Sequence, residues 1–274
     1  MKKWWTMIIS SLLTLTCLMG CSQRGTTHSS ENDNSWERIQ SSKTLRIGLD
    51  DSLPPLGFRD EQNQIVGFDI DVAKAVCETL GITLPPVPID WSMKFNELDA
   101  NNVDCLWNGF SYSEARAEKC TLSKPYLNNN QVLVTLKKSG ITSLTQMAGK
   151  ALSLQEQSSA EQALEEKTDF KNSLGQVVTF KENITAFKDI EAGQTDGLLI
   201  DSVMAEYYIA QQADPNQYVV IPEPLATEAY VIAFKKGDNA LKNQIETALS
   251  ELKKNGRLAE ISKKWFGQDI TNYQ

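Results

Sequence analysis

Apolar residues recur along most of the chain at the spacings typical of helices and strands. Between residues 68 and 80 they repeat at helical intervals on one face, and Gly81 directly follows as a helix stop. Short apolar runs at 45–49, 131–136 and 197–200 have the length of buried strands. The order of strands and helices predicts an α/β fold with mainly parallel sheets and helices on both faces.

The strand–helix pattern occurs twice before the chain closes. The first series ends at the polar segment 137–140, and the second runs as far as the Pro-Glu-Pro segment 222–224. One more strand, 227–234, and two helices, 239–254 and 257–265, complete the chain. We therefore expect two α/β lobes with a small-molecule site between them, beyond the carboxyl ends of the strands.

The first residues have the composition of an export signal. Two lysines precede an apolar stretch, 4–19, that is diluted by Ser and Thr and is too short for a membrane span. Its end resembles a lipobox, with Gly20 directly before Cys21. We predict residues 1–20 as a lipoprotein signal peptide and acylation of the Cys21 thiol, for example by palmitate. A plain signal peptide or a single anchor helix is the alternative.

The segment 21–35 is polar and has no apolar periodicity, which predicts a flexible tether of on the order of 20 Å. Without the signal peptide the chain carries 25 basic residues (27 less the two lysines) and 35 acidic residues, a net charge of −10. An acidic body disfavours nucleic acid and electrostatic attachment to anionic lipid. We therefore expect an extracytoplasmic protein that is held at the cell membrane by its N-terminal lipid.

The chain lacks the residues for several common kinds of catalysis. Its only histidine, His28, lies in the predicted tether, which excludes a His-based triad or a His-containing metal site in the body. No glycine-rich phosphate loop follows a strand. Neighbouring carboxylates such as Asp69 and Asp71 are typical of solvated helix starts. We therefore expect ligand binding without turnover, with no cofactor and no metal.

Three cysteines follow the tether: Cys77, Cys105 and Cys120. An odd number in an exported protein leaves either one free thiol or three. Cys105 and Cys120 flank the segment around Arg116, so a disulfide between them is one possibility. Sequence separation does not give the Cα distance that a bridge requires, and both alternatives stay open.

The segment 104–126 carries the most specific chemistry. Its pattern predicts a strand that ends in a turn at Asn108 and Gly109, followed by a short helix that Ser113 caps. Free backbone N–H groups then face a crevice, and Arg116 lies on the first turn of the helix. Amides, hydroxyls and a guanidinium together form a receptor for a carboxylate. The alternative is a surface turn with a solvated arginine.

Six motifs in the same order and spacing resemble one protein family. The chain is similar to the bacterial extracellular solute-binding proteins, family 3, which are polar amino-acid-binding receptors of ATP-binding cassette (ABC) importers. The matching motifs are Gly67-Phe68-Asp69-Ile70-Asp71-Val72-Ala73, Asn108-Gly109-Phe110-Ser111-Tyr112-Ser113-Glu114-Ala115-Arg116, Ser123-Lys124-Pro125-Tyr126, Thr195-Asp196-Gly197 with Asp201, Ala233-Phe234-Lys235-Lys236-Gly237, and Asn255-Gly256 with Lys264-Trp265-Phe266-Gly267.

The resemblance implies a two-lobed periplasmic-binding-protein-like fold of type II with a hinge of two crossovers. The first lobe would comprise residues 36–132 and 227–274, and the second lobe residues 133–226. The expected partners are a small-molecule amino acid and the permease and ATPase subunits of an importer, and the protein itself would be a monomer.

The resemblance also implies roles for particular residues. Arg116 would hold the α-carboxylate of the ligand, helped by Gly109 and by the amide and hydroxyl of Ser111. Ser159, with Ser158 beside it, would add donors to the carboxylate from the second lobe. Asp201 on that lobe would take the α-ammonium, and its place directly before residues 202–203 also predicts a helix N-cap. Both charges would then be satisfied only when the lobes close on the ligand. The complete predicted site comprises Asp50, Leu53, Trp91, Asn108, Gly109, Ser111, Arg116, Gln155, Ser158, Ser159 and Asp201.

Four of these residues would contact the ligand's side chain. Leu53 and Trp91 would enclose its aliphatic part, while Asp50 and Gln155 stand where side-chain-selecting residues sit. The lining is polar and not strongly basic, which favours glutamine or cystine, with a cationic amino acid as the runner-up because of Asp50.

Three further points stay open. Asn108 could donate a hydrogen bond to the ligand or cap the end of a strand, and Glu228 and Tyr230 could also face the cleft. An exported dehydratase of the same fold, acting on prephenate-like acids, is the alternative of another class. A membrane-bound sensor is the third.

Overall fold

The computed structural model describes residues 33–274. The predicted signal peptide 1–20, the predicted lipidation site Cys21 and most of the predicted tether lie outside the described residues. The helices are α1 (Ser35–Ser42), α2 (Phe68–Leu80), α3 (Lys94–Asp99), α4 (Glu114–Lys119), α5 (Ser159–Glu166), α6 (Thr168–Ser173), α7 (Asn183–Glu191), α8 (Ser202–Ala210), α9 (Asn239–Lys254) and α10 (Arg257–Phe266), with 3₁₀ turns η1 (Trp91–Met93), η2 (Lys137–Ser139), η3 (Leu144–Met147) and η4 (Pro215–Gln217).

The strands form two sheets. They are β1 (Ile47–Leu49), β2 (Ser52–Leu53), β3 (Gly57–Arg59), β4 (Ile65–Val66), β5 (Pro86–Pro88), β6 (Cys105–Ser111), β7 (Cys120–Leu122), β8 (Leu127–Leu136), β9 (Ala151–Gln155), β10 (Gln176–Phe180), β11 (Gly197–Asp201), β12 (Tyr218–Val220) and β13 (Ala226–Lys235). The small sheet has the order β2-β3-β4, and the main sheet follows the order β10-β9-β11-β8-β13-β6-β1-β5.

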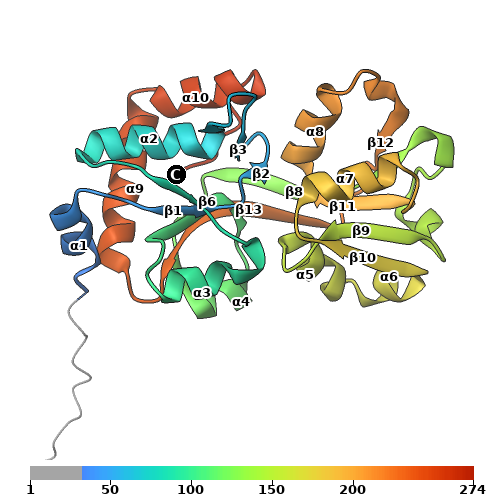
Figure 1. Ribbon diagram of the computed structural model, residues 1–274, viewed down its shortest axis with the longest axis horizontal. Coiled ribbons are helices and arrows are strands. Elements are labelled where there is room, and N and C mark those ends of the chain that lie inside the picture. Colours follow the sequence, from blue (N-terminus) through green and yellow to red (C-terminus); the bar gives the residue numbers. More distant parts are fainter. Residues whose placement is uncertain (1–32) are drawn as a thin grey trace, which may run out of the picture. The chain divides into compact units, whose positions relative to one another are not determined.

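In the main sheet the strands around β1 and around β9 pair in parallel, as the strand–helix alternation predicts, whereas the small sheet β2-β3-β4 is antiparallel. In the first lobe β1 lies between β5 and β6, and in the second lobe β9 lies between β10 and β11. Helices cover both faces: α2 and α10 lie opposite α3 and α4 in the first lobe, and α7 and α8 lie opposite α5 and α6 in the second (Figure 1). The carboxyl ends of β1, β6, β9 and β11 carry predicted site residues of both lobes.

Two long strands, β8 and β13, join the lobes and account for the antiparallel pairing within the main sheet. They pair with each other from Leu127 opposite Tyr230 to Gln131 opposite Ala226. Gln131 also pairs with Asp201 of β11, so β8 changes its neighbour from β13 to β11 at this residue. The predicted lobe limits, 132/133 and 226/227, lie within these two strands and stay a prediction.

Helix α2 illustrates how the sequence pattern produces the core. Its apolar stripe is buried, with Phe68, Ile70, Val72 and Val76 fully enclosed. Gly81 ends the helix at φ 65°, a left-handed conformation that favours glycine. Burial of a large aliphatic or aromatic side chain contributes about 1.5–3 kcal/mol, so this stripe anchors the helix to the sheet.

The prediction that the strand ends in a turn at Asn108 and Gly109 is wrong. Strand β6 continues to Ser111 and contains a bulge, because its register against β13 shifts between Val231 and Ala233. Gly109 has φ 57° at this bulge, and a Cβ there would lie 2.7 Å from the side chain of Leu56. The bulge re-aims the backbone that leads to α4, where Ser113 caps the helix as predicted.

All three cysteines of the described residues are buried free thiols. The possible disulfide between Cys105 and Cys120 is therefore not formed, and the alternative of three free thiols is the one observed. Burial raises the pKa of Cys77 to about 12 and that of Cys120 to about 11, and it raises the pKa of Cys105 well above its usual range.

These thiols are expected to be unreactive in the native protein. The thiolate is the reactive form, and burial disfavours it while also blocking access. A chromogenic disulfide reagent at pH 8 should therefore leave Cys77, Cys105 and Cys120 unmodified in residues 33–274 and titrate all three in denaturant. Rapid modification of the native protein at any of them would contradict the burial described here.

Candidate functional site

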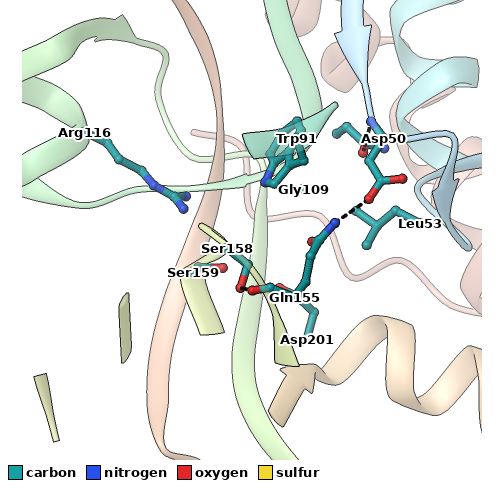
Figure 2. Close-up of a pocket in the computed structure, with 10 residues that line it drawn as sticks. Asp50, Leu53, Trp91, Gly109, Arg116, Gln155, Ser158, Ser159 and Asp201 are labelled. Carbon is teal, nitrogen blue, oxygen red and sulfur yellow. Dashed lines mark hydrogen bonds between the residues drawn. The ribbon is translucent and has the colours of Figure 1, made fainter. Parts of the chain in front are cut away.

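Ten of the eleven predicted site residues line one pocket between the lobes. Figure 2 shows Arg116 entering from one side, Asp50, Leu53 and Trp91 on another, and residues of the second lobe closing the remainder. The lining residues are Asp50, Leu53, Trp91, Asn108, Gly109, Arg116, Gln155, Ser158, Ser159 and Asp201. Ser111 lies directly beside the pocket, with its hydroxyl 3.1 Å from that of Ser159.

Arg116 is a buried cation without a carboxylate partner among the described residues. It is 6% exposed, and its guanidinium lies 4.6 Å from the ring centre of Phe110. One Nη1–H donates to the carbonyl of Ser111 at 2.9 Å. Burial lowers the pKa of Arg116, while the charges of Glu228 and Asp201 raise it. A buried, unpaired cation that faces a pocket is suited to binding an anionic ligand group.

The amide of Gly109 is not free, contrary to the prediction. Its N–H donates to Asp69 Oδ2 at 2.8 Å. Asp69 lies on the first turn of α2 and is fully buried, so it fixes the bulge of β6 from behind the pocket. The hydroxyl of Ser111 is also engaged, since it donates to Glu228 at 2.8 Å. The predicted help for the carboxylate from Gly109 and Ser111 would therefore require a rearrangement of these bonds.

Asp201 ends β11 and stands at the N-cap position of α8. Its side chain makes no capping hydrogen bond, so the predicted capping role is wrong. Instead, Oδ1 accepts from Asn129 at 2.5 Å, from Gln131 at 2.9 Å and from the hydroxyl of Tyr230 at 2.7 Å. Burial, followed by the charge of Glu228, raises the pKa of Asp201 to about 7. The three donors hold the carboxyl group toward the pocket from the crossover side.

Asp50 and Gln155 meet across the pocket from opposite lobes. Gln155 Nε2 donates to Asp50 Oδ2 at 2.7 Å, as the dashed line in Figure 2 marks. Asp50 Oδ1 accepts from the backbone and hydroxyl of Ser52, and Gln155 Oε1 accepts from Asn183 at 2.9 Å. Burial raises the pKa of Asp50, while its hydrogen bonds to Ser52 and Gln155 lower it. Gln155 Nε2 also donates to the carbonyl of Lys181 at 2.8 Å, so a ligand that accepts from Gln155 must replace one of its two bonds.

Asn108 holds the end of a strand. Its Oδ1 accepts from the backbone N–H of Asp50 at 3.1 Å, which fixes the exit from β1. Its Nδ2 is buried without a partner among the described residues, and a Cβ on Gly57 would lie 2.5 Å from it. The strand-end alternative is therefore observed, and donation to a ligand stays a prediction.

Serine residues at the start of α5 form the second-lobe wall. Ser158 caps the helix by accepting from the backbone N–H of Glu161 at 3.2 Å. Its hydroxyl also lies 2.7 Å from the carbonyl of Gln155. Ser159 Oγ accepts from Gln131 Nε2 at 3.1 Å. The N-terminus of α5 thus faces the pocket with its partial positive charge.

Sequence reasoning missed Lys94, Asn129 and Gln131. Lys94 is 1% exposed, and its Nζ donates to the carbonyls of Trp91 at 3.1 Å and of Gln157, in the other lobe, at 2.8 Å. Burial, followed by the neighbouring positive charges, lowers the pKa of Lys94 to about 7. A signal existed for all three: Lys94 follows Trp91 by one helical turn, and the amides occupy alternate positions of one strand.

The pH dependence of stability tests the buried carboxyl group of Asp69. Burial raises its pKa to about 7, whereas the unfolded value is about 3.9. The folded state therefore binds the Asp69 proton more tightly than the unfolded state does. The resulting contribution to the free energy of unfolding is present at pH 4 and is lost as the pH rises toward 7. Relative to Asp69→Asn, the free energy of unfolding of the wild type should fall by about 1.4 kcal/mol per pH unit across this range. Denaturant titrations that give a pH-independent difference would contradict the raised pKa.

Two other kinds of site are not found among residues 33–274. No group of three or more His, Cys, Asp or Glu side chains there could hold a metal ion. Within the same residues, no helix combines the length and apolar character that crossing a bilayer requires.

Two α/β lobes joined by two crossovers, with a charged pocket between them, define a two-lobed receptor for small polar molecules. The model of the bacterial extracellular solute-binding proteins, family 3, matches residues 45–268. The chain belongs to this family.

Individual relatives carry the identification further. An ABC uptake transporter substrate-binding protein from Streptococcus pneumoniae, solved with bound histidine, is 40% identical with a TM-score of 0.85, covering 88% of this chain and 99% of that one. The L-cystine-binding protein TcyJ of Escherichia coli is 26% identical over 85% of this chain and 86% of its own length. The arginine-binding extracellular protein ArtP of Bacillus subtilis is 29% identical over 97% of this chain and 98% of its own length. The chain is thus an extracytoplasmic amino-acid-binding protein of an ABC importer, and not an enzyme.

Proposed function

We propose that the protein captures a single polar α-amino acid, with its carboxylate on Arg116 and its ammonium on Asp201. The observation that carries this proposal is the buried Arg116, which forms no ion pair with a carboxylate of residues 33–274 and lines the same pocket as Asp201. A zwitterion pairs both groups, and neither charge is then buried uncompensated.

The pair Asp50 and Gln155 would select the ligand's side chain. Asp50 offers a carboxylate acceptor, and Gln155 offers an amide N–H that Asp50 accepts in the empty pocket. A side-chain amide, as in glutamine, would replace this bond with one bond to each residue. The distal ammonium and carboxylate of cystine would do the same. Glutamine or cystine is therefore the favoured ligand, with Leu53 and Trp91 packing on its aliphatic part.

A cationic amino acid is the second candidate. Three carboxylates lie in or beside the pocket, Asp50, Asp201 and Glu228, against one arginine. A ligand with a net positive charge would compensate this excess better than a neutral zwitterion. The histidine bound to the Streptococcus pneumoniae protein and the arginine named for ArtP agree with this alternative.

The attachment and lobe limits belong to the same proposal. The first lobe would comprise residues 36–132 and 227–274, and the second lobe residues 133–226. Lipid on Cys21 would keep both lobes near the importer's permease, to which the ligand is delivered. Labelled palmitate should enter the wild-type protein in cells and not Cys21→Ser. Equal labelling of the two proteins would remove the lipid anchor from the proposal.

Calorimetric titration of the purified protein against the twenty amino acids and cystine tests the ligand assignment. A polar amino acid should bind with a micromolar or lower dissociation constant, and apolar amino acids should bind far more weakly. Asp50→Asn should weaken a cationic ligand more than glutamine, because the amide keeps the hydrogen-bonding shape but not the charge. The absence of any micromolar ligand would overturn the proposal.

A further inference from the structure

Two carboxylates at the crossover side of the pocket share the same hydrogen-bond donors. Asn129 Nδ2 lies 2.5 Å from Asp201 Oδ1 and 2.6 Å from Glu228 Oε1. Gln131 Nε2 lies 2.9 Å from the first oxygen and 2.7 Å from the second. Because one nitrogen contacts both oxygens, Asp201 Oδ1 and Glu228 Oε1 are no more than about 5 Å apart. Nothing in the site assigned so far gives Glu228 a role.

The surroundings of this carboxylate pair hold one positive charge. The titratable and charged groups that face it among the described residues are Arg116 from α4 and Tyr230 from β13. The ring of Tyr126 lies next to that of Tyr230 in a tilted arrangement, with 6.4 Å between the ring centres. The hydroxyl of Tyr230 donates to Asp201 Oδ1 and that of Ser111 to Glu228, without adding charge. Arg116 is the same cation that the proposed ligand carboxylate would neutralise.

Two like charges at this separation in a buried site favour keeping one proton. The pKa of Asp201 is raised to about 7, first by burial and then by the charge of Glu228. An ammonium group that enters the pocket reverses the balance, since it stabilises the ionised carboxylate. At neutral pH the pair is therefore protonated in a fraction of the ligand-free molecules. Both carboxylates are ionised once the ammonium is bound.

We infer that Glu228 and Asp201 form a carboxylate pair that releases a proton when the ammonium of the ligand binds, so that affinity rises with pH. This inference rests on the proposed binding of an amino acid at Arg116 and Asp201. The ligand keeps all three protons of its ammonium, and the proton that leaves the pair passes to the solvent. Glu228 is thus a positioning residue that sets the protonation state of Asp201.

Calorimetric titration from pH 5.5 to 8.5, in buffers of different ionisation enthalpy, tests the pair. The full-length wild-type protein should release up to one proton on binding glutamine or arginine, whichever binds. Its dissociation constant should rise by as much as about tenfold per pH unit as the pH falls below 7. Glu228→Gln keeps the shape and an acceptor oxygen but removes the charge, so its release at pH 6.5 should be smaller and its pH dependence displaced to lower pH. Glu223→Gln, an exposed change in the segment between β12 and β13, is the control for loss of one carboxylate and should behave as the wild type does.

The outcomes separate this inference from the proposed function. If no amino acid binds the wild type at pH 8.5, the proposed function fails. If the wild type binds without releasing a proton, or if Glu228→Gln releases as much as the wild type, the carboxylate pair is wrong and the binding role stands. The comparison between variants removes protons that the ligand itself exchanges. The wild-type proton count decides the question even if Glu228→Gln does not fold.

Discussion

Replacement of Arg116 by alanine should raise the dissociation constant for the bound amino acid by about 10²- to 10³-fold, which corresponds to removal of one partner from a buried ion pair. Among the described residues, Arg116 is the one arginine that lines the pocket, and its guanidinium has no carboxylate partner. Without it, the ligand's α-carboxylate would be buried next to Asp201 and Glu228 with no compensating charge. Calorimetric titration at pH 8 measures the change directly.

Lys119→Ala supplies the matched control, because Lys119 lies on the same helix, α4, and is exposed. It should alter the dissociation constant by less than about threefold, as expected for a screened surface charge. The melting temperatures of both variants should first show that α4 is folded. Arg116→Ala that binds within threefold of the wild type would exclude the predicted carboxylate role.

Replacement of Gly67 by alanine should destabilise the fold by more than about 3 kcal/mol, or prevent folding altogether. Gly67 precedes α2 with φ 145° and ψ 172°, a backbone conformation that is essentially restricted to glycine. A Cβ at this position would lie 2.1 Å from the carbonyl oxygen of Leu56 and 2.8 Å from the backbone nitrogen of Gly57. Both obstacles are backbone atoms, so the clash cannot be relieved by a side-chain rotation.

Gly81→Ala, at the other end of α2, separates this clash from the general cost of losing a glycine. Gly81 has φ 65°, and a Cβ there would meet nothing within 4 Å. Its cost should be about 1–2 kcal/mol, the penalty for a left-handed L-residue. Chemical denaturation of the two variants measures both values, and equal costs would show that the contact with Leu56 can be relieved.

The sequence predicted the elements whose patterns are local. Helix α2 has its predicted limits, Phe68–Leu80, because an apolar stripe and a glycine stop mark it within one segment. Helix α6, Thr168–Ser173, was not predicted, because no buried residue gives it an apolar stripe. The turn predicted at Asn108 and Gly109 became a bulge in β6. Its outcome depended on pairing with β13, more than one hundred residues away.

The sequence predicted most of the residues of the candidate site but not the hydrogen bonds between them. Ten of the eleven predicted residues line the pocket. Most of them lie at the end of a strand or the start of a helix, and Asn108 and Gly109 lie at the bulge inside β6. The side chain of Asp201 was predicted to cap α8, but Asn129, Gln131 and Tyr230 bind it instead. These partners come from the two crossover strands, and only the pairing of β8 with β13 brings them together. The alternation of Asn129 and Gln131 indicates that their side chains share one face of a strand, but it does not indicate which carboxylates they bind.

A crystal structure of the protein with its tightest-binding amino acid tests whether Arg116 and Asp201 bind the two charged groups of the ligand. We expect the ligand in the pocket between the lobes, with its α-carboxylate within about 3 Å of the Arg116 guanidinium and its ammonium within about 3 Å of the Asp201 carboxylate. A ligand bound elsewhere, or in the pocket with neither group on its assigned residue, would contradict it.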